Sequence, residues 1–67
     1  MLEIVVNGET REFPANLTVA GLTDQLGLTG KRIAVEKNGE IVPKSQYAVT
    51  ALISGDRLEI VVAVGGG

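Results

Sequence analysis

The sequence predicts an α+β roll, in which a mixed β-sheet carries one main helix across one face. Three features predict it: two Asn-Gly pairs that follow β-branched runs, one segment with helical spacing of apolar residues between them, and a last strand that is apolar at almost every position. The 67 residues suffice for one small domain, and 45% hydrophobic residues supply enough apolar surface for its core.

The first hairpin is predicted at the start of the chain. Residues 2–6 are rich in β-branched side chains, and residues 9–13 alternate in character. Asn7-Gly8 lies between them and favours a two-residue turn. Pro14 ends the second strand, because proline has no N–H to donate to a neighbouring strand.

A short amphipathic helix is predicted after this hairpin. Thr18 is a suitable N-cap, because its hydroxyl can accept a hydrogen bond from a backbone N–H of the first turn. Apolar residues then recur at offsets of three and four, which places Val19, Leu22 and Leu26 on one helical face. We expect this face to cover the sheet and Gly27 to mark the end of the helix.

A second hairpin is predicted after the helix. Residues 33–37 form a third strand, the second Asn-Gly pair forms the turn, and residues 40–42 form a short fourth strand. Pro43 ends this strand, and a short strand ended by proline is typical of a sheet edge. We expect the connector of residues 44–54 to contain about one helical turn.

Residues 57–64 form the longest and most apolar strand, which is typical of the centre of a sheet. We expect this strand to run parallel to the first strand, which gives the β-grasp architecture. Alternation then directs one set of side chains towards the helix: Leu2, Ile4, Val6, Leu58, Ile60 and Val62. It directs another set towards the open face: Glu3, Val5, Glu59, Val61 and Ala63. The predicted domain comprises residues 1–64, and residues 65–67 form a C-terminal tail.

The composition excludes several classes of function. Cysteine and histidine are absent, so the chain has no disulfides, no thiolate metal sites and none of the commonest catalytic nucleophiles and bases. The net charge is -2 and only 3% of residues are aromatic, so nucleic acid has no evident binding surface. No apolar run approaches the roughly 20 residues that span a bilayer. We expect a cytoplasmic protein, monomeric when free, that binds no metal, nucleic acid or membrane and works with protein partners.

Other polar residues are weaker candidates for chemistry. Asp56, in a turn before the last strand, is typical of turn chemistry rather than of a general base. Lys31, Arg32 and Lys44 are typical of solvated surface, the alternative being that one of them steers a partner. Tyr47 is expected to pack on the sheet edge with its hydroxyl in water.

The chain ends in three glycines, Gly65, Gly66 and Gly67. Glycine loses more backbone entropy on ordering than alanine does, so this tail is expected to be mobile. It extends about 10 Å at roughly 3.3–3.6 Å per residue, and without side chains it can pass through a narrow slot. The atom it can deliver is the carboxylate carbon of Gly67. The alternative is a frayed terminus without function.

Four segments distributed along the chain form a recognisable pattern: Asn7-Gly8, Asn38-Gly39-Glu40-Ile41-Val42-Pro43, Gly55-Asp56 and Gly66-Gly67. Together they resemble the ThiS family, the small sulfur carrier proteins of thiamine biosynthesis in the ubiquitin-like β-grasp group. The Gly-Gly end alone is shared with other ubiquitin-like proteins and with the small subunit of molybdopterin synthase. The middle segment and the short length point to the thiamine branch.

The resemblance implies that the chain is a protein co-substrate and not an enzyme. An ATP-dependent adenylyltransferase of the ubiquitin-activating type would adenylate Gly67. A persulfide from a cysteine desulfurase or a related donor would then convert the acyl-adenylate to a thiocarboxylate, and thiazole synthase would receive the sulfur. Gly65 and Gly66 would thread the tail into these enzymes. The carrier would bind no cofactor itself, because its partners use the ATP and the persulfide.

Docking to such partners needs a rigid surface beside the tail. Val5, Val61 and Ala63 are expected to form an apolar patch on the open face, and a patch rimmed by charges is typical of a protein interface. Three other functions use the same features. They are sulfur transfer for molybdenum cofactor synthesis, ubiquitin-like attachment of Gly67 to lysines, and a structural module with an inert tail.

Overall fold

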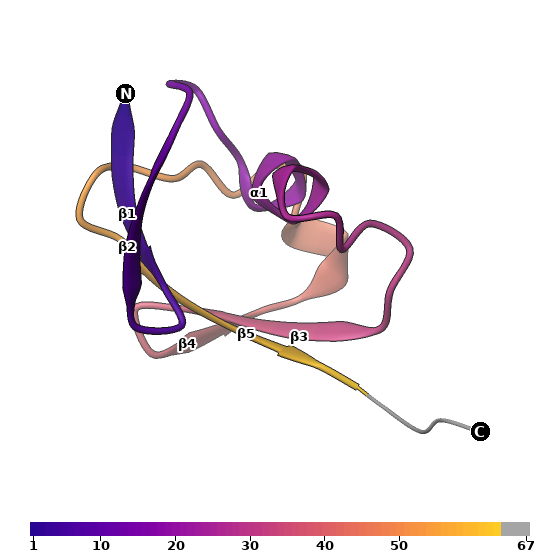
Figure 1. Cartoon of the computed structure of the whole chain (residues 1–67). Helices are drawn as coiled ribbons and strands as arrows, with labels where there is room; N and C mark the ends of the chain where they lie inside the picture. Colours follow the sequence, from indigo (N-terminus) through magenta and orange to yellow (C-terminus); the bar gives the residue numbers. More distant parts are fainter. Residues whose placement is uncertain (64–67) are drawn as a thin grey trace.

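The computed structural model describes residues 1–63 of the chain (Figure 1). Its elements, in chain order, are β1 (Leu2–Val6), β2 (Glu9–Phe13), α1 (Val19–Gln25), β3 (Ile33–Lys37), β4 (Glu40–Val42), the 3₁₀ helix η1 (Lys44–Gln46) and β5 (Arg57–Val62). The two predicted hairpins and the helix between them are confirmed. Val64, the predicted end of the last strand, and the tail of residues 65–67 lie outside the described residues.

The five strands form one mixed sheet in the order β2-β1-β5-β3-β4. β1 and β5 are parallel, with Val6 opposite Leu58, and the other neighbours are antiparallel. β5 is therefore the central strand, and β4, which Pro43 follows, is an edge, as the sequence predicted. α1 lies across one face and leaves the other face open (Figure 1). This is the predicted β-grasp architecture.

The hydrophobic core lies between the sheet and α1. Its buried side chains are Ile4, Val6, Phe13, Leu17, Val19, Leu22, Val35, Val42, Leu52, Leu58 and Ile60. Three residues expected there lie at its margin instead: Val62 is 38% exposed, Leu2 is half-buried, and Leu26 is a half-buried C-cap that follows the helix. For Val62 the reason is length, because seven helical residues span roughly 10 Å whereas the six residues of β5 span roughly 20 Å. α1 is too short to cover the end of β5.

Hydrogen bonds from outside the helix hold the N-terminus of α1. The Thr18 hydroxyl accepts a hydrogen bond from the Gly21 N–H at 3.2 Å, which confirms the predicted N-cap. The Ala20 N–H donates to the Tyr47 carbonyl at 2.9 Å. The second bond joins the segment after η1 to the first turn of the helix.

The asparagines of the two Asn-Gly turns bond to the backbone of β5. Asn7 Oδ1 accepts a hydrogen bond from the Ile60 N–H at 2.8 Å, and Asn7 Nδ2 donates to the Ile60 carbonyl at 3.1 Å. Asn7 thus extends the pairing of β5 beyond the end of β1. Asn38 Oδ1 accepts a hydrogen bond from the Arg57 N–H at 2.9 Å, at the start of β5. Both asparagines have positive φ values, 49° and 52°, which this residue type tolerates.

Asp56 completes the bonding at the start of β5. Its side chain is 5% exposed, and its carboxylate accepts hydrogen bonds from Asn38 Nδ2 at 3.0 Å and from the Ile53 N–H at 2.9 Å. These bonds confirm the turn role predicted for Asp56. The carboxylate fixes the chain where it enters the central strand.

The role of Asn7 can be tested by replacing it with glycine. Glycine tolerates the positive φ but removes both bonds to Ile60. We expect Asn7→Gly to lower the free energy of unfolding by about 1–2 kcal/mol, measured by urea denaturation.

Asn16→Gly is the matched control. Asn16 also has a positive φ, 62°, and its side chain makes no hydrogen bond to any atom of residues 1–63. This variant should change the free energy of unfolding by less than about 0.5 kcal/mol. Equal losses in the two variants would show that the asparagine side chain does not hold β5.

Candidate functional site

The end of β5 that leads to the tail is paired on one side only. The Ala63 N–H donates to the Arg32 carbonyl at 2.9 Å, which ties the last described residue to the chain entering β3. On the other side β1 has ended, and the Asn7 side chain makes the last bonds, at Ile60. Because backbone groups alternate along β5, the N–H and C=O of Val62 point towards the side where β1 has ended. Within residues 1–63 no strand lies beside them there. The backbone is therefore anchored up to Ala63, immediately before residues 64–67.

The face of the sheet opposite α1 is open, and the strand register assigns its residues. Val61 is 64% exposed and lies directly opposite Ala34 of β3. Ile41 of β4 is 66% exposed and lies opposite Glu36, which makes it a diagonal neighbour of Ala34. We define the apolar patch as Ala34, Ile41, Val61 and the exposed Ala63. The patch lies at the end of the sheet from which the chain continues into the tail.

The structure does not bring Val5 together with the rest of this patch. Val5 faces the open side but is half-buried, and it lies opposite Arg57, four residues before Val61. At a rise of about 3.3 Å per residue, roughly 13 Å separates the two positions along the sheet. Ala34 and Ile41 were not identified from the sequence, because their proximity to Val61 depends on the register of β3 with its two neighbours.

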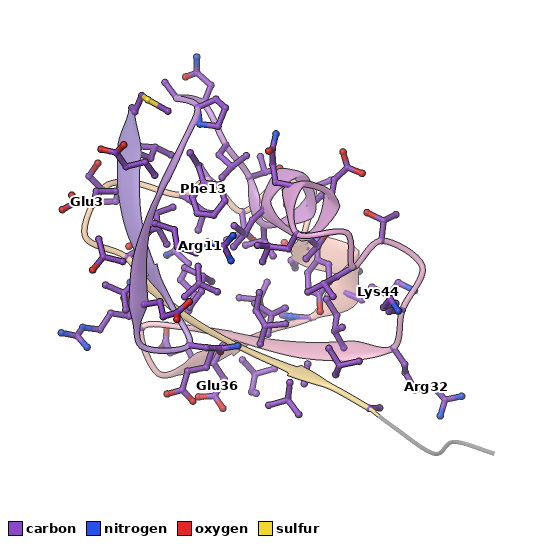
Figure 2. The ribbon with its side chains drawn as sticks, in the orientation of Figure 1. Glu3, Arg11, Phe13, Arg32, Glu36 and Lys44 are labelled. Atoms are coloured by element: carbon purple, nitrogen blue, oxygen red, sulfur yellow. The ribbon has the colours of Figure 1, made fainter. Side chains whose placement is uncertain are left out.

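Two pairs of glutamates face each other on the open face. Glu36 of β3 lies directly opposite Glu59 of β5, next to the apolar patch. Glu3 of β1 lies opposite Glu12 of β2. Figure 2 shows Glu36 projecting from the sheet on the side away from α1. These carboxylates give the open face a negative potential. Because like charges directly opposite each other destabilise a sheet, the two pairs also lower the stability of the fold.

The described residues at this end of the sheet expose apolar and acidic side chains. Within residues 1–63 no three acidic side chains come close enough together to hold a metal ion. No helix of the described chain is long and apolar enough to cross a membrane. The apolar patch and the glutamates beside it are the groups that the open face exposes near Ala63.

Comparison with known proteins identifies the family. The sequence model of the ThiS family matches residues 4–67. This chain belongs to the ThiS family. Its structure resembles the crystal structure of the thiamine biosynthesis protein ThiS from Geobacter metallireducens, with a TM-score of 0.83 and 28% sequence identity over 98% of this chain and 100% of the other. This likeness confirms the β-grasp fold.

Two curated relatives are much longer proteins. The chain is 52% identical over 66 residues to a thiazole synthase of Paramagnetospirillum magneticum and 35% identical over 66 residues to a thiazole synthase of Magnetococcus marinus. Each match covers 98% of this chain and 20% of the relative. The chain thus spans about a fifth of the length of these relatives, each of which carries a ThiS-like segment.

Proposed function

We propose that this chain is a sulfur carrier of thiamine biosynthesis that transports sulfur as a thiocarboxylate on Gly67. Membership of the ThiS family supports a carrier role. The observation that carries the proposal is the origin of the tail, which continues from the central strand immediately after the anchored backbone of Ala63. A rigid strand followed, after Val64, by three glycines is suited to place one carbon atom in a partner's active site.

The Gly67 carboxylate needs activation before it can take up sulfur, because an ionised carboxylate resists nucleophiles at neutral pH. One carboxylate oxygen attacks the α-phosphorus of ATP, and pyrophosphate leaves. The terminal sulfur of a persulfide then attacks the acyl carbon, and AMP leaves. A second thiol cleaves the resulting S–S bond and releases the thiocarboxylate. An adenylyltransferase of the ubiquitin-activating type would catalyse the first step, and a cysteine desulfurase or a related donor would supply the persulfide.

Thiazole synthase is the acceptor that we propose. Two relatives that contain a ThiS-like segment are named thiazole synthase, which places a carrier-like segment in the same chain as its proposed acceptor. The chain would donate the sulfur atom of the thiazole ring and regain the Gly67 carboxylate. It would therefore act as a co-substrate that is used repeatedly.

We propose the apolar patch as the surface on which these partners dock. It adjoins the start of the tail, and a partner that covers it buries two side chains, Val61 and Ile41, that are 64% and 66% exposed. Glu36 and Glu59 border it and would pair with cations of the partner, which favours specific orientation. Val5, half-buried and roughly 13 Å from Val61 along the sheet, would lie outside this docking surface.

The intact mass of the chain isolated from cells tests the proposed cargo. We expect a fraction whose mass exceeds that of the unmodified chain by the difference between sulfur and oxygen, because one carboxylate oxygen is replaced. Reaction with a thiol-specific reagent should remove this fraction selectively, since the chain has no cysteine. Adducts joined to other proteins through Gly67 would instead favour a ubiquitin-like modifier, and an unchanged mass during thiamine synthesis would contradict the proposal.

The length and width of the tail can be tested separately. One residue added after Gly67, or the substitution Gly66→Val, should reduce ATP–pyrophosphate exchange by the cognate adenylyltransferase about 100-fold, because a misplacement near 1 Å has effects of this size. One glycine added before Met1 is the matched control, since the N-terminus lies away from the end of β5 (Figure 1). Full exchange by the chain extended after Gly67 would refute a threaded tail.

The apolar patch can be tested by placing a carboxylate in it. Val61→Asp should fold and should weaken binding to both partners by about 1–3 kcal/mol, measured by calorimetry, because the charge lies at the centre of the docking surface. Thr10→Asp adds the same charge to the open face opposite Val5 and should change binding little.

Circular dichroism supplies the folding control for these variants. Ile60→Asp should unfold the chain, because it places an unpaired carboxylate at a position 7% exposed. Equal binding losses for Val61→Asp and Thr10→Asp would contradict the assigned patch. Unfolding of Val61→Asp would contradict the assignment of strand faces.

A further inference from the structure

A pocket of about 370 Å³ lies on the helix side of the sheet, where α1 leaves the core uncovered. α1, the loop before β3, the start of β3, and η1 with the residues after it form its walls. The volume falls within the range of small-molecule sites, roughly 300–1,000 Å³. The pocket and the apolar patch lie on opposite faces of the sheet.

The floor of the pocket is apolar. Leu28, Ile33 and Tyr47 line it, are half-buried and pack against the core. Thr23 also lines the pocket but is 5% exposed, and its hydroxyl already donates to the Ala20 carbonyl at 2.8 Å. This floor favours the apolar body of a ligand, because it is hydrophobic surface that remains accessible from solvent.

The mouth of the pocket is basic. Lys31, Arg32 and Lys44 belong to the pocket lining, and the lining within residues 1–63 contains no acidic residue. Figure 2 shows the Arg32 side chain projecting away from α1, so we assign the positive charge of the mouth to Lys31 and Lys44. One carboxylate outside the lining is hydrogen-bonded to it: Asp24 Oδ1 accepts a hydrogen bond from the hydroxyl of the lining residue Thr29 at 3.3 Å. The surplus of positive charge favours an anionic ligand.

Hydrogen bonds hold the walls of the pocket in place. The Ala20 N–H donates to the Tyr47 carbonyl at 2.9 Å, which joins two walls. The Leu28 N–H donates to the Thr23 carbonyl at 2.8 Å, and the Lys31 N–H donates to the Leu28 carbonyl at 3.0 Å. A site with bonded walls loses little conformational freedom when a ligand enters.

We propose that this pocket binds a small organic anion. The apolar body of the ligand packs on Leu28, Ile33 and Tyr47, and its phosphate or carboxylate group lies at the basic mouth. This site goes beyond the sulfur-carrier function, which uses the opposite face and the tail. The backbone carbonyl of Arg32, a residue of the pocket lining, accepts the hydrogen bond from the Ala63 N–H, which links one wall of the pocket to the residue that follows β5.

Phenyl phosphate is the probe for this proposal, and benzyl alcohol is its neutral counterpart. Titration into the isotope-labelled full chain is followed by amide chemical shifts. Phenyl phosphate should produce saturable shifts in residues 28–33 and 44–48, with a Kd on the order of 1 mM. Benzyl alcohol should bind about five-fold or more weakly, because it cannot contact the cations as an anion does. Shifts centred outside these residues, or equal binding of the two compounds, would overturn the proposal.

Two variants distinguish binding of the anion at the basic mouth from its attraction by the overall charge of the protein. Lys44→Gln should weaken phenyl phosphate binding about five-fold and leave benzyl alcohol binding unchanged. Arg57→Gln removes the same charge from the open face and should bind phenyl phosphate as the unmodified chain does. Equal effects of the two variants would show that long-range charge alone attracts the anion and would overturn the proposal.

Two further ligands test the chemistry of the site. Inorganic phosphate should bind more weakly than phenyl phosphate, and equal affinity would overturn the proposal, because the apolar floor would then contribute nothing to binding. A short acidic peptide should not compete with phenyl phosphate; a peptide that binds here while phenyl phosphate does not would overturn the assignment in favour of an acidic loop of a partner protein. None of these readouts involves sulfur transfer, so failure here leaves the carrier function untouched.

Discussion

The bonding of two asparagine side chains to the central strand is the interaction on which the structure depends. β1 pairs with β5 only as far as Val6 and Leu58, so the Asn7 side chain takes the place of further strand residues at Ile60. Asn38 does the same for the first N–H of β5. Asparagine suits both positions, because it tolerates a positive φ and carries a donor and an acceptor on one short side chain. The turn residues thereby set the position of β5 as well as the reversal of the chain.

This constraint connects the fold with the proposed chemistry. A strand that is bonded from its start at Arg57 to Ala63 holds its last residue in a fixed position relative to the core. The residues that follow carry no side-chain functional group, so in the proposed function the tail would contribute a carboxylate and could pass through a narrow channel. Partner enzymes would then supply the ATP, the sulfur and the catalytic groups. This proposed division of labour agrees with the absence of histidine and cysteine from the sequence.

The elements could be predicted from the sequence because their signals are local. Asn-Gly pairs and prolines mark the ends of the four hairpin strands, and the strand bounds agree with the structure. The composition of the apolar patch could not be predicted, because Ala34 lies opposite Val61 only in the observed antiparallel register. The marginal position of Val62 depends on the short length of α1, and the pocket depends on the loop before β3 and η1 lining the same cavity as α1. Each of these features is set by tertiary packing.

The open face carries two features that a surface shaped only by folding would avoid. Apolar side chains of β-strands are exposed there, and Glu36 faces Glu59 at a cost of a few tenths to about 1 kcal/mol. Such a cost matters because domains are stabilised by only about 0.05–0.15 kcal/mol per residue. In a complex on the proposed docking surface both costs would change sign. Burial of Val61 and Ile41 would contribute hydrophobic free energy, and cations of a partner would replace the repulsion between the two carboxylates with attraction. A protein that presents an apolar surface without such cations would bury the patch and leave the carboxylates repelling each other. On this proposal the glutamates would contribute discrimination between partners, and the apolar side chains would contribute affinity.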